Sequence, residues 1–402
     1  MGPAVPATFT DLTKRQWAFE MSRPFETSLY YGRMRYLVNA LRRDLAKKMI
    51  LLAGPRQVGK STLARGLLSS TGVYLNWDVR KDQAVIRQQA WPKDASLVVL
   101  DEIHKFPKWK NFLKGLSDEF ANSPPVLVTG SAKLDTYRKS GDALTGRAYL
   151  YHLHPIDPAE AAAFLPAFTA DERLARLLAA GGFPEPFLNP DDAERLLNDR
   201  LDVVVREDLR DLSRVGSLRT IQLLVELLRE RVGGPLSLPN LAQDLGVSAP
   251  TVRSWVELLE RLYLVFRLQP FAGALARGLR KESKLYFYDC AAGPEDARLE
   301  NVVACALLKF CEYQRDTTGK NFALHYFRDR EGREVDFVVT LNRKPHWLVE
   351  VKEDEARLSP SLRYLHQRFK PALSVQLVRT LDRALEIDGI KIVPLADWCQ
   401  RL

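Results

Sequence analysis

Short runs of apolar residues alternate with stretches of helical periodicity between residues 36 and 160. The runs occupy residues 49–53, 73–75, 97–100 and 125–128. A run that is apolar at every position and contains β-branched residues is typical of a strand buried on both faces. Because helical stretches separate these strands, the pattern predicts a parallel sheet that is covered on both sides.

Residues 157–232 show a different pattern, rich in Ala, Leu, Arg and Glu at helical spacing, which predicts an all-helical section. The sequence Gly181-Gly182-Phe183-Pro184 interrupts it, and we expect a tight backbone turn at the two glycines. Two short helices and an apolar strand follow. From about residue 283, a helix at about 297–313 and strands at 285–288, 324–327, 335–340 and 346–351 predict a second α/β unit.

The composition fits a globular protein of several domains, with 402 residues, of which 46% are hydrophobic and 27% charged. The net charge of +9 excludes a histone-like polycation and leaves a nucleic-acid partner open without proving one. No run approaches the roughly 18 apolar residues of a transmembrane helix, and the N-terminus lacks the pattern of a signal peptide. Four cysteines without metal-binding spacing predict reduced thiols and a cytoplasmic protein with no membrane partner.

A phosphate-binding motif follows the first apolar run. The motif G-x-x-x-x-G-K-[ST] is matched by Gly54, Pro55, Arg56, Gln57, Val58, Gly59, Lys60 and Ser61, and Thr62 opens the amphipathic stretch behind it. A strand, this loop and a helix in that order are the context that the motif requires, since the loop N–H groups and the helix N-terminus together cradle phosphates. We expect ATP to bind here, with Lys60 on the β- and γ-phosphates and Ser61 on Mg²⁺.

Two acids, Asp101 and Glu102, end the apolar run 97–100. At the end of a strand beside the phosphate loop, Asp101 is expected to lie near Mg²⁺, directly or through water, and Glu102 to polarise the attacking water. Together with the loop, this pair predicts a hydrolytic ATPase, in which positioning and charge stabilisation supply most of the catalysis.

The stretches GPRQVGKST, LDEIHK, VTGSA, LTGR and GGFP occur in the same order in a large group of bacterial and archaeal AAA-type ATPases, which this chain resembles nearly end to end. The resemblance implies an α/β protein with a C-terminal module similar to restriction-endonuclease folds. Since AAA-type ATPases usually work as rings, it also implies a homo-oligomer such as a hexamer. The expected parts are a helical leader (1–35), a P-loop ATPase core (36–156), a helical, lid-like section (157–232), a winged-helix-like module (233–282) and a restriction-endonuclease-like domain (283–402).

Two further catalytic candidates follow the fourth apolar run, residues 125–128. In AAA-type ATPases a small polar residue at a strand end orients water or the γ-phosphate, and Ser131 is preferred here over Thr129. Arg147 lies on a predicted loop, where it is a candidate arginine finger for a neighbouring subunit's nucleotide or a sensor for its own. An ordinary surface arginine is the alternative.

Residues 237–255 predict two helices around a turn at Gly246, followed by an apolar strand, as in a winged helix. Ser248 is expected to cap the second helix, and Pro250 suits its first turn. The residues expected to contact DNA are Thr251, Arg253 and Ser254 on that helix and Arg277, Arg280, Lys281 and Lys284 in the wing region. A protein-packing module with a solvated basic loop is the alternative.

Asp336, Glu350 and Lys352 occur in the order D…E-x-K across a predicted strand–turn–strand. Glu350 and Lys352 are two residues apart on one strand, so both face the same side. Carboxylates in this arrangement can bind Mg²⁺ while the lysine activates water, and Glu300 can add a further carboxylate from the helix. The pattern predicts a Mg²⁺-dependent DNA endonuclease site, with a structural cluster of mutually paired charges as the alternative.

Two functions from different classes remain open. The first is an ATP-driven enzyme that remodels DNA or translocates along it, such as on branched, recombination or repair intermediates, with a nuclease-like C-terminal domain. The second is an ATP-dependent switch or protein-remodelling regulator whose C-terminal domain is a non-catalytic interaction platform.

Overall fold

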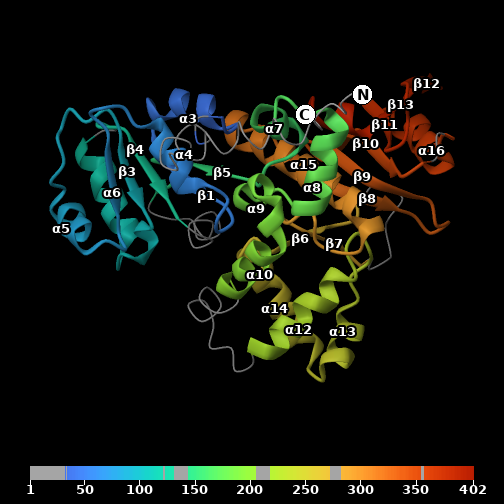
Figure 1. Cartoon of the computed structure of the whole chain (residues 1–402), viewed down its shortest axis with the longest axis horizontal. Helices are drawn as coiled ribbons and strands as arrows, with labels where there is room; N and C mark the ends of the chain where they lie inside the picture. The colour runs from blue at the N-terminus through green and yellow to red at the C-terminus, as the bar shows by residue number, and fades with distance from the viewer. Residues whose placement is uncertain are drawn as a thin grey trace, which may run out of the picture.

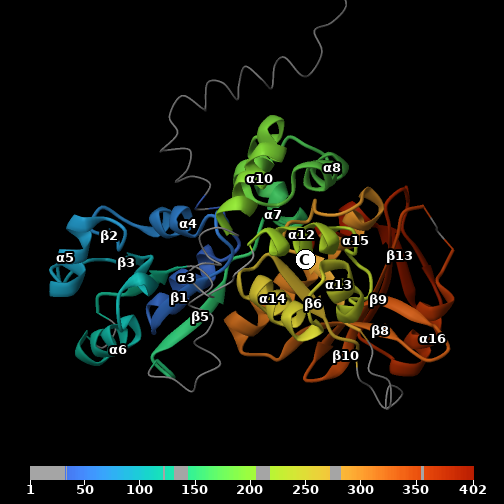
Figure 2. The same ribbon diagram turned by 90° about the horizontal axis from the view of Figure 1, so that it is seen from below.

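The computed structural model describes residues 32, 34–120, 123–130, 144–204, 218–271, 282–354 and 357–402. The expected helical leader lies almost entirely outside these residues, as do Ser131, Arg277, Arg280 and Lys281. A first sheet and a C-terminal sheet lie at opposite ends of the long axis in both views (Figure 1, Figure 2), with helices between them.

The first sheet has five strands in the order β2-β3-β4-β1-β5, and every neighbouring pair is parallel. Its strands are β1 (Met49–Ala53), β2 (Val73–Asn76), β3 (Val98–Asp101), β4 (Val126–Thr129) and β5 (Ala148–His152). Every residue of β1, β3 and β4 is buried, which confirms the parallel sheet that the apolar runs predict. The edge strand β5 was not predicted, because its sequence AYLYH contains no continuous apolar run.

Helices cover both faces of this sheet, as predicted. They are α3 (Val38–Leu45), α4 (Lys60–Leu67), α5 (Arg80–Gln88) and α6 (Trp109–Phe120), with a 3₁₀ turn at Ile103–Lys105. Along β1, Ile50 and Leu52 pack with α3 and α4, whereas Met49 and Leu51 pack with α5 and α6. Successive side chains of β1 therefore point to opposite faces of the sheet, and both faces are buried.

The helical section contains α7 (Pro158–Phe164), α8 (Ala170–Ala180), α9 (Pro184–Leu188), a 3₁₀ turn (Pro190–Asp192), α10 (Ala193–Val203) and α12 (Leu218–Arg229). The first two of these helices begin at side-chain caps: Asp157 accepts the N–H of Glu160, and Thr169 forms a capping box with Glu172. Gly181 ends α8 with a left-handed φ of 74°, which confirms the tight turn expected at the two glycines.

Helices α13 (Leu238–Leu245) and α14 (Ala249–Arg261) are joined at Gly246, whose φ is 65°. The Oγ of Ser248 accepts the N–H of Thr251 at 3.3 Å, so the predicted cap of the second helix is confirmed. Strands β6 (Val265–Leu268) and β7 (Lys284–Phe287) form an antiparallel pair. The strand that we expected at 285–288 in the C-terminal unit therefore pairs with β6 instead.

The C-terminal unit is a mixed six-stranded sheet with helices on both faces. Its elements are α15 (Glu295–Thr318), β8 (Phe322–Arg328), β9 (Glu334–Leu341), β10 (Lys344–Lys352), α16 (Pro360–Phe369), β11 (Leu373–Val378), β12 (Leu385–Ile387), β13 (Ile390–Pro394) and α17 (Leu395–Cys399). Asn342 and Arg343, both at positive φ, form the two-residue turn of the β9–β10 hairpin.

Helix α15 connects the two sheets. It packs on the C-terminal sheet through Val303 and Leu307, and it also contacts β5 and α8. One buried apolar cluster consequently runs from Leu41 beneath the first sheet to Val339 in the C-terminal sheet. Within the described residues, no helix combines the length and the hydropathy that crossing a bilayer requires.

Gly182→Ala should destabilise the protein by about 1–3 kcal/mol, because overpacking at a fixed backbone cannot relax. The added Cβ would lie 2.3 Å from the carbonyl oxygen of Ile156. Gly115→Ala on α6 is the matched control: nothing lies within 4 Å of its Cβ, and alanine is the better helix former. Urea unfolding of both variants measures the difference, and an equal loss of stability would contradict the steric explanation.

Candidate functional site

The phosphate loop joins the end of β1 to the start of α4. Gly54 and Gly59 have positive φ angles of 145° and 95°, which side chains rarely allow. A Cβ on Gly54 would lie 2.4 Å from the carbonyl oxygen of Leu153, so the loop passes directly against the chain beyond β5. The motif glycines are thus required by the backbone turn and by close packing as well as by phosphate binding.

The ammonium of Lys60 turns inward over this loop. It donates to the carbonyl oxygens of Gly54 at 2.9 Å and Pro55 at 2.5 Å, and the residue is 8% exposed. An ammonium held by loop carbonyls at the N-terminal end of a helix is positioned to exchange these acceptors for phosphate oxygens.

Asp101, at the end of β3, accepts hydrogen bonds from hydroxyl groups on three different elements. Its Oδ2 accepts the hydroxyl of Ser61 at 2.6 Å and that of Tyr74, while Oδ1 accepts the hydroxyl of Thr129. The structure therefore brings Ser61 and Asp101 together, as predicted. Burial and the neighbouring Asp101 charge raise the pKa of Tyr74 to about 12, so this phenol remains a donor.

These residues fit MgATP. The ammonium of Lys60 lies over the loop at the start of α4, and an alcohol and a carboxylate, both oxygen ligands suited to Mg²⁺, lie 2.6 Å apart at Ser61 and Asp101. Ser61 and Asp101 are the residues that would hold the ion.

Glu102 follows Asp101 with a left-handed φ of 55°, which turns its side chain away from the strand. Its Oε2 lies 3.4 Å from Nζ of Lys105 and 3.7 Å from Nε2 of His104. Burial, together with the charge of Asp101, raises the pKa of this carboxyl above its ordinary value, although Lys105 opposes the shift. A partly desolvated carboxylate beside the loop has the properties of a general base.

Of the two remaining catalytic candidates, Ser131 and Arg147, the structure describes only Arg147. Ser131 lies outside the described residues, whereas Thr129, the less preferred alternative, donates its hydroxyl to the buried Asp101. Arg147 pairs with Asp118 of α6, with Nε–Oδ1 at 2.7 Å, at the surface of its own chain. Its role as a finger or sensor stays a prediction.

The second helix of the helix–turn–helix presents the expected residues to solvent. Arg253 and Ser254 are exposed and Thr251 is half-buried, while Val252 and Val256 point into the core. Lys284 is different: it lies in β7 with only 6% exposure. The expectation that Lys284 faces phosphates in an open basic loop is wrong, because carboxylates of the C-terminal unit surround its ammonium.

The predicted carboxylate cluster does assemble. Asp336 on β9 accepts the N–H of Val351 at 2.9 Å, next to Glu350 and Lys352 on β10. Burial raises the pKa of Asp336 well above its usual range, and the charges of Glu350 and Glu300 add to the shift. Four acids and two lysines lie together here, namely Glu300, Glu334, Asp336, Glu350, Lys284 and Lys352.

This cluster does not fit a divalent cation as it stands. The ammonium of Lys284 lies 2.7 Å from Glu334, 3.3 Å from Glu300 and 3.8 Å from Asp336, where a metal ion would have to bind. Lys352 lies 3.0 Å from Oε1 of Glu350, whose buried Oε2 has no hydrogen-bond partner among the described residues. Among the described residues no group of three acids, histidines or cysteines is arranged to hold a metal. The metal site expected at Glu300, Asp336 and Glu350 is therefore not supported.

Sequence reasoning missed a second set of charged residues, Arg35, Asp157, Glu160 and Lys309. They form a buried network between the phosphate loop and α15. Arg35 and Glu160 are 125 positions apart and match no motif, so no local signal identifies them.

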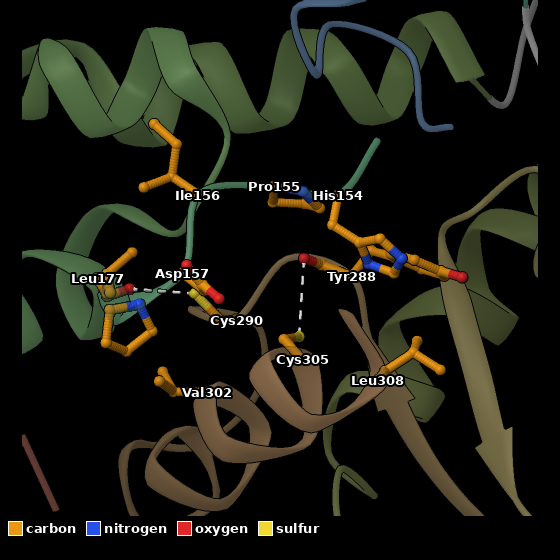
Figure 3. Close-up of a pocket in the computed structure, with 11 residues that line it drawn as sticks. His154, Pro155, Ile156, Asp157, Leu177, Tyr288, Cys290, Val302, Cys305 and Leu308 are labelled. Atoms are coloured by element: carbon orange, nitrogen blue, oxygen red, sulfur yellow. Dashed lines mark hydrogen bonds between the residues drawn. The ribbon is translucent and has the colours of Figure 1, made fainter. Parts of the chain in front are cut away.

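A small cavity lies beside this network, where the chain beyond β5 meets α8 and α15 (Figure 3). Cys290 and Cys305 line it and donate to backbone carbonyl oxygens. Its volume of about 10 Å³ is at most sufficient for one water molecule, so it is a packing defect and no ligand site.

Three families match successive segments of the chain. Residues 46–162 match the AAA domain, residues 171–293 match a domain of unknown function (DUF8612), and residues 296–398 match another domain of unknown function (DUF4143). The phosphate loop, Asp101, Glu102 and Arg147 all lie within the AAA domain.

Two mycobacterial proteins, both described as uncharacterized and from Mycobacterium tuberculosis and Mycobacterium bovis, are each 25% identical to this chain over 372 residues. These residues are 89% of this chain and 80% of theirs. Replication-associated recombination protein A of Bacillus subtilis is 25% identical over 115 residues, which are 27% of this chain and 26% of its own length.

Likeness to solved structures is weaker. Aeropyrum pernix ORC1 in complex with DNA has a TM-score of 0.33 at 15% identity, covering 67% of this chain and 92% of that one. Drosophila ORC bound to AT-rich DNA and Cdc6 has a TM-score of 0.22 at 12% identity, covering 71% and 95%. At such TM-scores these likenesses carry nothing over to this chain.

Lys284→Met should lower the stability of the protein by about 3 kcal/mol, because it leaves acids without their buried counter-charge. The value is at the low end of the range for broken buried pairs, since Glu300 and Glu334 keep 24% and 30% of their side-chain exposure. Lys344→Met, on the exposed end of β10, is the control and should change stability by less than about 0.5 kcal/mol. Urea unfolding compares them, and equal stabilities would show that Lys284 is not the counter-ion of the cluster.

Proposed function

We propose that this chain is an ATP-hydrolysing enzyme of the AAA type that acts on DNA. The observation that carries the ATPase part is the 2.6 Å contact between Ser61 and Asp101, which joins the phosphate loop to the strand-end carboxylate. The match of residues 46–162 to the AAA domain supports the same assignment.

Each residue has a distinct role in this proposal. Lys60 exchanges its loop carbonyls for β- and γ-phosphate oxygens, and Ser61 and Asp101 hold Mg²⁺. Bound Mg²⁺ supplies neutralisation of the phosphate charge. Glu102 accepts a proton from the attacking water, a role to which its partial burial is suited. Arg147 is proposed as the finger or sensor of a ring-shaped oligomer.

The DNA part rests on the exposed face of α14. We assign α13, α14 and the β6–β7 pair to a winged-helix-like module whose Arg253 and Ser254 reach DNA. The net charge of +9 supports this assignment, as does the name of the Bacillus subtilis relative, which matches 27% of this chain. An arginine on the exposed face of a second helix is the residue type that contacts phosphates and base edges.

The C-terminal domain is proposed to keep a restriction-endonuclease-like order of elements, with Asp336, Glu350 and Lys352 in the expected places on β9 and β10. The pairing of its acids with Lys284 and Lys352 favours the alternative of a non-cleaving interaction platform over an active nuclease. Hydrolysis by the ATPase core then serves remodelling or movement, and no cleavage step is assigned.

Lys60→Ala should weaken binding of ATP at least about tenfold and abolish hydrolysis, because it removes a charge-assisted contact with the phosphates. Lys93→Ala, an exposed lysine of the same domain, is the matched control and should behave as wild type. Phosphate release and binding of a fluorescent ATP analogue measure both properties. Full turnover by Lys60→Ala would overturn the assignment of the phosphate loop.

Arg253→Ala should weaken DNA binding and lower the dependence of log affinity on log salt by about one unit if the arginine meets a phosphate. Arg219→Ala, an exposed arginine on α12, should change neither quantity. Fluorescence anisotropy with duplex, single-stranded and branched DNA at several salt concentrations, run with DNA-stimulated ATPase assays, provides the measurement. An ATPase that is indifferent to every DNA would instead favour the protein-remodelling regulator.

A further inference from the structure

A chain of buried ion pairs leads from the phosphate loop to the C-terminal domain. Nη1 of Arg35 donates to the carbonyl oxygen of Val58, inside the loop, at 2.6 Å. Nε of the same guanidinium lies 2.9 Å from Oε1 of Glu160 at the start of α7. The other oxygen of Glu160 lies 2.7 Å from Nζ of Lys309, which belongs to α15. Three side chains therefore span the distance between the nucleotide loop and α15.

The positive and negative charges of this network balance. Lys309 also lies 2.7 Å from Oδ1 of Asp157, so two cations face two anions, and each residue is between 4% and 6% exposed. Burial opposes ionisation of Glu160, but Arg35 and Lys309 lower its pKa to about 2. Because an unpaired buried charge is costly, each of these side chains is confined to the place that its partners define.

Arg35 contacts the part of the loop that is expected to bind phosphate. The carbonyl that it holds belongs to Val58, immediately before Gly59, and Nη1 lies 3.3 Å from the position that a Cβ on Gly59 would take. Gly59 is the left-handed residue that starts α4, so its orientation sets where Lys60 and the first helical N–H groups point. A shift of the guanidinium would therefore move the phosphate-binding groups.

Helix α15 is also fixed to the chain beyond β5. His152 contacts Asp316 at 2.7 Å, and His154 contacts Glu312 at 2.6 Å, along the same face of the helix as Lys309. Nη2 of Arg35 donates to the carbonyl of His154 as well. The cavity beside Asp157 has a volume of only about 10 Å³, so this side of the contact is closely packed (Figure 3).

We propose that Arg35, Glu160 and Lys309 are positioning residues through which the C-terminal domain sets the affinity of the phosphate loop for ATP. The proposal rests on ATP binding by the loop, and it adds a regulatory input from α15 to that site. None of the three residues is among those assigned above to the phosphates or to Mg²⁺. Coupling between two sites acts in both directions, so nucleotide binding at the loop also shifts the position of α15.

The test is nucleotide affinity of the full chain, measured with a fluorescent ATP analogue and Mg²⁺, and KM and kcat for ATP. Lys309→Met should raise the dissociation constant and KM about three- to tenfold with little change in kcat, since the groups that perform hydrolysis stay in place. Arg35→Met, which contacts the loop directly, should have the larger effect. Lys309→Arg, which keeps the cation, should restore binding to near the wild-type level.

Two further variants separate positioning from a general loss of stability. Leu365→Ala removes a buried side chain of α16, on the face of the C-terminal sheet opposite to α15, so it should lower stability and leave the dissociation constant unchanged. Lys309→Met with Asp157→Asn keeps the network balanced in charge, so it should fold even where the single variant does not, and should still bind ATP weakly.

The outcomes distinguish this proposal from the proposed function. Wild-type affinity in folded Lys309→Met or in the double variant would overturn the coupling while leaving the ATPase assignment intact. Equal weakening by Leu365→Ala would also overturn it, because loss of stability would then explain the effect. A wild-type chain that binds no ATP would overturn the proposed function and the coupling together.

Discussion

The structure depends most on how the buried charges of helix α15 are neutralised. Lys309, Glu312 and Asp316 follow one another at helical spacing, so they lie on one face of the helix, against the first sheet. Each of them pairs with a residue of one segment, residues 152–160, which begins at the end of β5. Since breaking a buried pair costs several kcal/mol, α15 has one register against this segment, and the two sheets have one arrangement.

The same segment constrains the nucleotide site from the other side. The carbonyl oxygen of Leu153 excludes any side chain at Gly54, and that of Ile156 excludes one at Gly182. A Cβ on Gly181 would lie 2.3 Å from Oδ1 of Asp289, a buried acid near Arg200. The glycines at 181 and 182 are thus explained by close packing, without any chemical role. Residues 152–160 form the common boundary of the phosphate loop, the helical section and α15.

The parts that the sequence could predict are those whose signal is local. The phosphate loop, the acids after β3, four strands of the first sheet and the cap at Ser248 each depend on a few consecutive residues. The network of Arg35, Glu160 and Lys309 depends on pairs 125 and 149 positions apart, which no periodicity or motif links. Lys284 was misplaced for a related reason: it ends a basic stretch, and only the tertiary structure shows that acids from α15 and β9 surround it.

The charges around Lys60 in the phosphate loop differ from those around Lys284 in the C-terminal cluster. This difference determines what each site can bind. At the phosphate loop, Lys60 donates to two neutral carbonyl groups, which a phosphate can replace with a charge-assisted contact. In the C-terminal cluster, Lys284 is held by three carboxylates, which raise its pKa despite burial, so an added cation must first displace a charge that is already matched. The first site is arranged to accept an anion, whereas the second already contains its cation. A cluster with the residues of a metal-dependent nuclease can therefore serve the packing of β7 against the C-terminal sheet, and its residue types alone do not establish catalysis.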